Sequence, residues 1–163
     1  MIGDITGNRR TPAMAYWLFK TEPDTYSIDD LRQEQRCGWE GIRNYQARNR
    51  LRDEVKKGDQ VFIYHSSCKV PAIVGLAEVV RDAYPDPTQF DPEAPYYDPK
   101  SDPDAPRWLR VDVAYRRHFP HPVTLRDIKA DPTLAGMELV NRSRLSIQHV
   151  DDDIASRLLK RLG

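Results

Sequence analysis

The sequence predicts an α+β domain in which short helices flank a curved, mostly antiparallel sheet or small barrel. Three observations lead to this fold class. The chain has 163 residues, which suits a single domain. Segments of strand length are scattered among segments of short-helix length, in no regular βαβ order. The longest apolar runs, such as 72–74, are far shorter than the ~18 residues of a membrane span.

The ordered part of the chain is expected to begin near residue 15. Residues 1–14 show no hydrophobic periodicity, so we expect a disordered extension there and one domain over residues 15–163. The aromatic-rich segment Tyr16–Lys20 is typical of a buried first strand, and Pro23 ends it.

Capping residues predict the first two helices. Ser27, followed three residues later by Asp30, forms a variant of the capping box and predicts a short helix. Residues 37–41 contain two glycines and are expected to form a loop. Asn44 is then expected to cap a second helix over 45–55, which lysines and a glycine close.

Three further strands are predicted from apolar alternation. They cover residues 60–65, 71–80 and 108–119. Gly75 inside the second of them indicates a bulge or a close approach of another backbone.

The region 85–106 is predicted to be a long irregular loop, because it holds seven of the 13 prolines. Its aromatic residues either pin the loop to the domain or form a wall over a pocket. After the last strand, Thr124 is expected to cap a helix over 125–130, and 135–140 is a short apolar piece. Residues 146–150 lead into an amphipathic helix over 151–162.

The net charge is zero, with 25 basic and 25 acidic residues, but the charges are segregated. Residues 42–57 and 107–126 each carry an excess of four cations, whereas 82–106 carries an excess of six anions. Zero net charge argues against a protein that coats polyanions by bulk attraction. It is compatible with one basic face, or simply with solvated surface charge.

The cysteines and histidines predict neither a metal nor a cofactor. Cys37 and Cys68 are too few for a disulfide-dense scaffold or a four-cysteine zinc site, and no His or Cys pair has metal-ligand spacing. No apolar segment typical of a signal peptide opens the chain. We therefore expect a soluble intracellular protein that works as a monomer.

The segment from Trp39 to Asn49 is the richest in chemistry. An indole beside an amide and a guanidinium can stack a planar base and hydrogen-bond its edge. The alternative is that Trp39 belongs to the core and the arginines are solvated. We expect no catalysis from His65 and Ser66, because adjacent strand residues point to opposite faces and no nucleophile elbow surrounds the serine.

Several motifs in order resemble the EVE domain family. They are Ala15–Pro23, Trp39–Asn49 without Glu40, Gly58-Asp59, Tyr64–Ser66, Tyr84–Asp86, Tyr97–Pro99 and Arg144–Gln148. The resemblance runs over about Tyr16–Leu159. It implies a PUA-like fold, a small mixed, mostly antiparallel β-barrel with flanking short helices. It also implies a non-enzymatic module that binds nucleic acid and holds one modified base in an aromatic-lined pocket.

Carried over by position, the resemblance assigns the pocket to twelve residues. They are Trp17, Lys20, Thr21, Trp39, Gly41, Asn44, Tyr45, Arg48, Asn49, Tyr64, His65 and Ser66. Thr21 replaces a serine common in the family, and its extra methyl narrows the space. Contacts to the nucleic-acid backbone are expected from Arg43, Arg50 and Arg107, with Arg48.

The expected partner is nucleic acid, DNA before RNA, carrying 5-methylcytosine or one of its oxidised forms. The alternatives are an RNA-binding module, an enzyme that hydrolyses a modified nucleotide, and a small-molecule sensor. The expected location is the cytoplasm, or the nucleus in a eukaryote.

Overall fold

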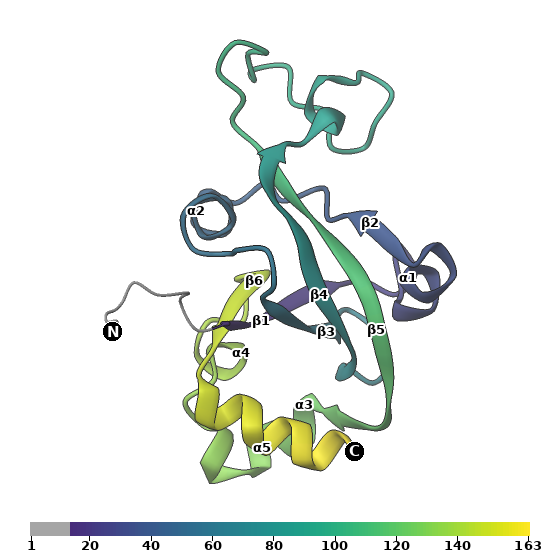
Figure 1. Cartoon of the computed structure of the whole chain (residues 1–163), viewed down its shortest axis with the longest axis vertical. Coiled ribbons are helices and arrows are strands. Elements are labelled where there is room, and N and C mark those ends of the chain that lie inside the picture. Colours follow the sequence, from purple (N-terminus) through teal and green to yellow (C-terminus); the bar gives the residue numbers. More distant parts are fainter. Residues whose placement is uncertain (1–13) are drawn as a thin grey trace, which may run out of the picture.

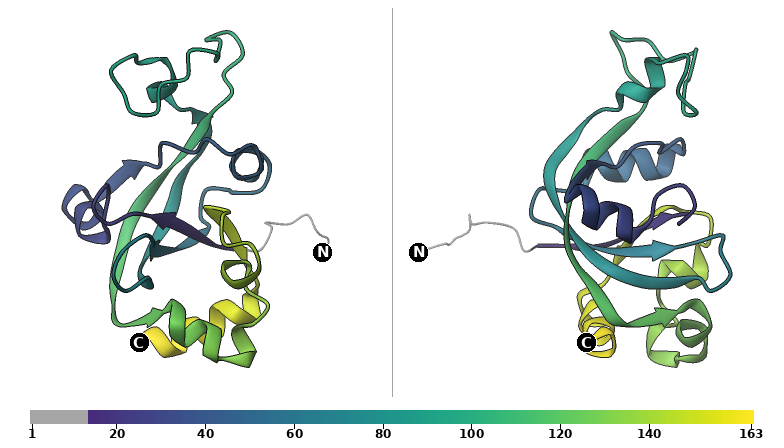
Figure 2. Two further views of the ribbon diagram at one scale, coloured as in Figure 1. Left: turned by 180° about the vertical axis from the view of Figure 1, so that it is seen from behind. Right: turned by 90° about the vertical axis from the view of Figure 1, so that its right-hand side faces the viewer.

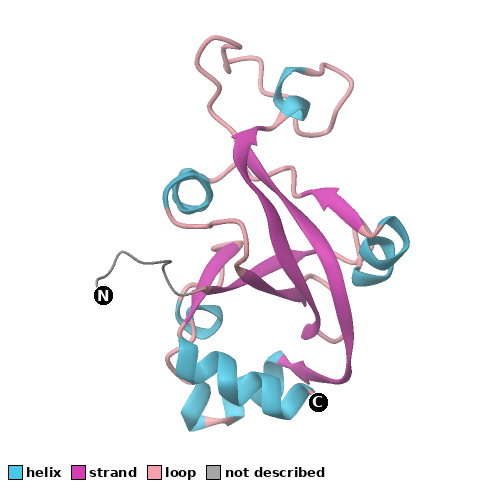
Figure 3. Ribbon diagram, viewed as in Figure 1, coloured by secondary structure: helices cyan, strands magenta, loops and turns pink. Residues whose placement is uncertain are grey.

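The computed structural model describes residues 14–163, so the predicted disorder of 1–14 falls, apart from Met14, outside the described residues. The strands are β1 Tyr16–Thr21, β2 Arg36–Gly38, β3 Gln60–His65, β4 Ala72–Pro85, β5 Leu109–Thr124 and β6 Ile147–Val150. The helices are α1 Ile28–Glu34, α2 Tyr45–Asp53, α3 Leu125–Ala130, α4 Glu138–Asn141 and α5 Asp152–Leu162. Two 3₁₀ turns cover Pro87–Phe90 and Pro132–Leu134 (Figures 1 and 3).

The strands form one mixed sheet in the order β2-β5-β4-β3-β1-β6, with only β1 and β3 parallel among the described strands. The mostly antiparallel α+β prediction is confirmed, but the expectation of a closed barrel is wrong. The outer strands β2 and β6 have three and four residues. These two strands do not pair with each other, so the sheet is open, and their shortness limits the unpaired backbone that it exposes.

The long hairpin β4–β5 is the main departure from the predicted strand lengths. These strands have 14 and 16 residues, and they bow around helices α1 and α2 (Figure 2). Pro120 and Pro122 fall where the pairing of β5 with β4 is interrupted, between His118 and Val123. Prolines are tolerated at such irregularities because no ladder hydrogen bond is lost there. The predicted loop 85–106 connects the two strands and projects beyond the rest of the domain (Figure 1).

The caps of α1, α2 and α3 are confirmed. The Ser27 hydroxyl accepts from Asp30 N and the Asp30 side chain accepts from Ser27 N, which is a complete capping box. Asn44 Oδ1 accepts from Ala47 N at 2.9 Å, and Thr124 caps α3. Strands β2 and β6 are not predicted from the sequence: β2 overlaps the start of the expected loop 37–41, and β6 lies in the segment expected to lead into α5.

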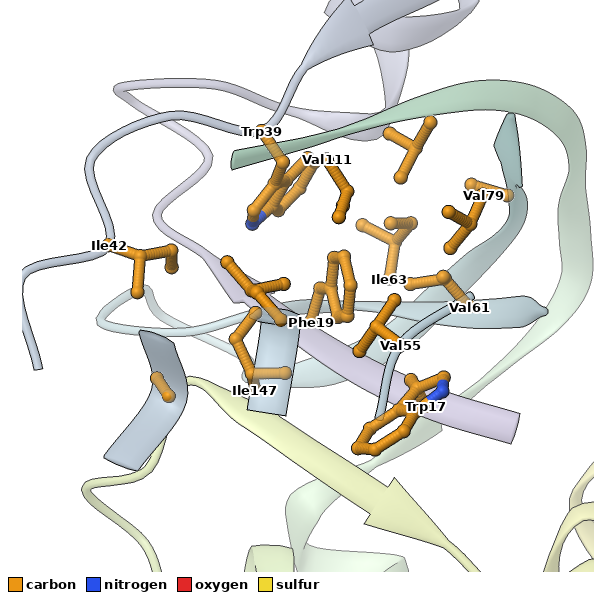
Figure 4. Packing of buried hydrophobic residues seen from close by; sticks show 14 of the residues in the cluster. Trp17, Phe19, Trp39, Ile42, Val55, Val61, Ile63, Val79, Val111 and Ile147 are labelled. Atoms are coloured by element: carbon orange, nitrogen blue, oxygen red, sulfur yellow. The ribbon is translucent and has the colours of Figure 1, made fainter. Parts of the chain in front are cut away.

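Alternation along β1 and β3 divides the hydrophobic core between the two faces of the sheet. Trp17 and Phe19 pack on one face with α1 and α2, whereas Leu18 and Phe62 pack on the other with α3, α4 and α5. Figure 4 shows the first face, where Phe19 and Ile63 lie between Trp39 and Trp17. Trp39 and Ile42 belong to the same cluster as the buried residues of α1 and α2, so this packing holds the loop 39–44 that joins β2 to α2.

Gly75 lies where a side chain has no room. A Cβ there would lie 2.6 Å from Ile28 Cδ1 and 2.8 Å from the carbonyl oxygen of Arg117. The isoleucine methyl can turn aside, but the backbone oxygen cannot.

We expect Gly75→Ala to lower the free energy of unfolding by about 1–3 kcal/mol through overpacking, measured by urea denaturation. Gly136→Ala is the matched control, because its Cβ would meet only Ile154 Cδ1, at 3.9 Å. An equal effect of the two substitutions would contradict the close approach at Gly75.

Candidate functional site

A cleft of about 1210 Å³ opens at the carboxyl ends of the parallel strands β1 and β3. Its floor comes from Lys20 and Thr21 of β1 and from Ser66 and Ser67 after β3. The other walls are the turn 22–26, Glu34, residues 36–42, Tyr96 of the long loop and the segment before β6, with Ser143, Arg144 and Ser146. Five of the twelve expected pocket residues line this cleft: Lys20, Thr21, Trp39, Gly41 and Ser66.

Trp39 belongs both to the core and to the cleft wall. Its side chain is buried, with its ring centroid 5.6 Å from that of Phe19 and 6.1 Å from that of Tyr26. Within residues 14–163 its indole N–H has no hydrogen-bond acceptor, and Figure 4 shows the nitrogen turned away from Val111, on the side of Ile42. Burying a hydrogen-bond donor without an acceptor costs free energy of folding unless water or a ligand accepts the bond.

Pairing between strands brings the two predicted hydroxyl residues together. Thr21 lies opposite His65 in the β1–β3 ladder, and Ser66 N donates to Thr21 O at 2.9 Å. Thr21 Oγ1 donates to the carbonyl of Tyr26 at 2.7 Å, which ties β1 to the turn before α1. The cleft floor is therefore polar and held by local bonds.

Ionisable groups in the cleft are balanced, with three cations and three acids: Lys20, Arg36 and Arg144 against Glu22, Glu34 and Glu40. Burial raises the pKa of the Cys37 thiol to about 11, so this thiol is protonated at neutral pH and is a poor nucleophile. Burial, and then the charge of Asp86, raise the pKa of Glu40. The Tyr26 hydroxyl donates to Glu34 Oε1 at 2.6 Å.

The rim of the cleft is organised around the fully buried Asp86. Its Oδ2 accepts from Gly41 N at 3.0 Å and from Arg43 Nη1 at 3.1 Å, and its Oδ1 accepts from the backbone and hydroxyl of Thr88. Arg43 also donates twice to the carbonyl of Tyr96. Gly41 has a φ of +85°, and a Cβ there would lie 2.7 Å from the Tyr96 ring. A side chain at position 41 would therefore clash with the Tyr96 ring, and glycine lets this ring pack against the cleft rim.

The helix α2 residues do not line the cleft. Asn44 uses its side-chain oxygen as the cap of α2. Tyr45 is half exposed and lies on Trp108, with ring centroids 4.8 Å apart, and Arg48 covers its ring at 4.9 Å. Arg48 and Asn49 are bonded to each other, with Arg48 Nη1 also donating to the carbonyl of Arg107. This group attaches the long loop to α2.

Trp17, Tyr64 and His65 also lie outside the cleft lining. Trp17 is buried in the core and its Nε1 donates to Asp59 Oδ2 at 2.9 Å. Tyr64 is buried on the opposite face of the sheet. His65 Nε2 accepts from Ile28 N at 3.1 Å at the start of α1, and burial lowers the pKa of its ring. The imidazole that a hydrolase would need is therefore already engaged.

Of the arginines expected at the nucleic-acid backbone, Arg43 and Arg50 are used within the fold. Arg43 binds Asp86, Thr88 and Tyr96 as described. Arg50 forms a two-pronged ion pair with Glu138 of α4, at 2.5 and 2.8 Å. Arg107 is partly exposed and lies 3.9 Å from Asp98.

Sequence reasoning did not assign Tyr26, Cys37, Tyr96 or Arg144 to the site. Tyr26 lies between the predicted first strand and first helix, and Cys37 lies in a segment expected to be a loop, so nothing local placed them beside Trp39. The possibility that the aromatics of 85–106 form a wall was the one signal for Tyr96. No group of three or more metal-ligating side chains occurs in the part of the chain that the structure describes. No helix there is long and apolar enough to cross a membrane.

A family model described as the EVE domain matches residues 15–161. Among curated relatives, thymocyte nuclear protein 1 of Mus musculus is 43% identical over 152 residues, covering 82% of this chain and 67% of that protein. The Danio rerio protein of the same name is 40% identical over 156 residues, covering 84% and 67%. The chain thus spans about two thirds of the length of these relatives.

Solved structures match over nine tenths of the chain. A hypothetical protein from Leishmania major has a TM-score of 0.89 at 40% identity, covering 92% of this chain and 95% of that one. A protein from Pseudomonas putida has a TM-score of 0.87 at 43% identity, covering 91% and 100%. The human THYN1 protein, in complex with DNA that contains 5-methylcytosine, has a TM-score of 0.87 at 39% identity, covering 91% and 97%.

Proposed function

Because the chain belongs to the EVE domain family, we propose that it is a non-enzymatic module that binds DNA and accepts one modified cytosine, 5-methylcytosine or an oxidised form of it, into the cleft beside Trp39. The observation that carries this proposal is the likeness to human THYN1, which was crystallised with DNA containing 5-methylcytosine. Such a protein would work where DNA is accessible, in the bacterial cytoplasm or in a nucleus.

The chemistry of the cleft suits a planar, polar ligand. The indole N–H of Trp39, which has no acceptor within residues 14–163, and the Ser66 hydroxyl offer hydrogen bonds to a base edge, and the Thr21 oxygen can accept one. The cleft is large enough for a whole nucleotide. Flipping a base out of a duplex costs a few kcal/mol, and one aromatic contact returns about 1–3 kcal/mol. We therefore expect modest affinity that depends on salt and on the fit of one base.

The side chains do not favour a hydrolytic reaction. Cys37 is protonated at neutral pH, and His65 Nε2 is occupied by a backbone N–H. Both observations support binding rather than catalysis as the role of the cleft.

The test is a titration with fluorescent oligonucleotides that differ only in one cytosine. Burial of the 5-methyl group should contribute about 0.8 kcal/mol, which is about a fourfold tighter Kd for 5-methylcytosine than for cytosine. Single-stranded, double-stranded and RNA versions of the same sequence decide which nucleic acid is preferred. Equal affinity for modified and plain DNA would contradict the proposal, and tighter binding of the RNA would favour the RNA-binding alternative.

A further inference from the structure

The fold leaves three of the four expected phosphate-binding arginines, Arg43, Arg48 and Arg50, with few free donors for a ligand; Arg107 is the partly exposed exception. Arg43 donates from all three of its nitrogens, and Arg48 likewise donates from Nε, Nη1 and Nη2 to acceptors of this chain. Arg50 is paired with Glu138 and also donates to the carbonyl of Ile147. A phosphate would have to displace these partners, which leaves carboxylates and carbonyls of the fold unpaired.

The cations at the cleft differ in the hydrogen bonds and ion pairs that they form within the fold. Arg36 is paired with Asp112 at 3.2 Å. Arg144 is exposed, lines the cleft, and has no hydrogen bond or ion pair with any residue in the described range 14–163. Lys20 donates to the carbonyl of Ser143, a contact that uses one of its three protons.

Lys20 and Arg144 occupy the same side of the cleft. Lys20 N donates to the carbonyl of Ser146 at 3.0 Å, so the segment 143–146 lies along the end of β1. Ser66 and Ser67 line the cleft beside them, and their hydroxyls are not engaged with other described residues. Glu34 is the last residue of α1 and Glu40 follows β2, the strand at the sheet edge opposite β6, whereas Glu22 lies in the turn after β1.

We propose that Lys20 and Arg144, with the hydroxyls of Ser66 and Ser67, bind the backbone phosphates that flank the base in the cleft. This inference rests on the proposed DNA-binding function and names the part of the cleft that holds the backbone. Arg144 supplies a planar pair of donors that matches a phosphate, and Lys20 supplies a point charge. The acids next to β2 repel phosphates, so the backbone lies on the β1–β6 side.

Partial burial lowers the pKa of Lys20, which indicates that its ammonium group has lost hydration without gaining an acidic partner. A bound phosphate would supply that partner. Ser67 has a φ of +52°, an unusual value for a residue other than glycine, and it turns the chain at the cleft edge after β3.

The test is the salt dependence of binding to plain and methylated oligonucleotides. Arg144→Ala and Lys20→Gln should each reduce the slope of log K against log salt concentration by about 0.7–0.9, the value for one phosphate contact. They should weaken binding to both DNAs by the same factor, so that the preference for the methylated base is kept. Lys20→Arg should restore most of the slope.

Two arginine variants serve as controls. Arg48→Ala removes a cation bonded within the fold, and Arg52→Ala removes an exposed cation paired with Asp53, away from the cleft. Neither should change the slope. If the slope falls in Arg48→Ala but not in Arg144→Ala and Lys20→Gln, the inference is wrong while the proposed function stands. If the wild-type protein binds no DNA, both the inference and the proposed function are wrong. If the wild-type protein binds plain and methylated DNA equally well, only the proposed function is wrong.

Discussion

Replacing Asp86 by alanine is expected to lower the free energy of unfolding by about 3–5 kcal/mol, the range for removing one partner of a buried ion pair. The carboxylate is fully buried and faces Arg43 at 3.1 Å. Without it, Gly41 N and Thr88 N lose their acceptor, and Arg43 Nη1 keeps only the carbonyl of Ile42. Domains of this size are stable by only about 5–15 kcal/mol, so the loss should be plain in urea denaturation.

The same substitution should weaken DNA binding, because Asp86 connects both sides of the cleft rim. It holds Gly41 directly and positions Arg43, which in turn holds the backbone of Tyr96. Thr88 and the buried Gln89 continue this network into the long loop. Asp102→Ala is the matched control in that loop, because the exposed Asp102 caps only the N–H of Asp104. A loss of stability in Asp102→Ala equal to that of Asp86→Ala would contradict this role.

The free energy of unfolding measured as a function of acidic pH gives a second test of Asp86. Burial alone would raise its pKa, but the bonds from Thr88, Gly41 and Arg43 outweigh burial and hold the pKa below its ordinary value. A group with a lowered folded-state pKa stabilises the fold above its unfolded pKa, near 4, and that contribution is lost as pH falls through the folded pKa. Asp86→Asn should therefore flatten the fall in stability below about pH 4.

The sequence predicted helix starts well because caps are local. Ser27, Asn44 and Thr124 each satisfy a backbone N–H three residues away, so no distant contact is needed to recognise them. Strands β2 and β6 were missed because three or four residues hold no periodicity, and each becomes a strand only by pairing with β5 or β1. The sheet is open because β2 and β6 do not pair with each other, which the local pattern does not reveal.

The candidate site was predicted in part for a similar reason. Trp39, Thr21 and Ser66 lie where strands end, and the ladder of β1 with β3 brings two of them together. The polar residues Tyr45, Arg48 and Asn49 of α2 were assigned to the pocket by the family resemblance, carried over by position. The partners of Arg48 and Tyr45 are Arg107 and Trp108, which lie about 60 residues further along the chain. Such long-range pairing is set by the path of the loop 85–106 and leaves no local pattern.

Trp39→Phe should weaken binding of methylated DNA about tenfold while the protein stays folded. The phenyl ring keeps an aromatic surface next to Phe19 but removes the indole N–H, the donor that has no acceptor among the described residues. A hydrogen bond lost from a desolvated site costs about 0.5–1.5 kcal/mol, and the smaller stacking surface adds to it. Fluorescence anisotropy with the methylated oligonucleotide measures the change, and far-ultraviolet circular dichroism monitors the fold.

Trp17→Phe is the matched control, since the two tryptophans pack in the same hydrophobic cluster. Its indole N–H donates to the buried Asp59, which also accepts from the backbone of Ala15 and Lys56, and it does not reach the cleft. The control should therefore lower the free energy of unfolding by about 1–3 kcal/mol and leave DNA affinity unchanged. Should both variants lose stability and neither lose affinity, Trp39 would be a core residue only, and the base would have to bind elsewhere. A loss of affinity confined to Trp39→Phe separates contact with the base from general weakening of the core, because both variants carry the same chemical change in the same cluster.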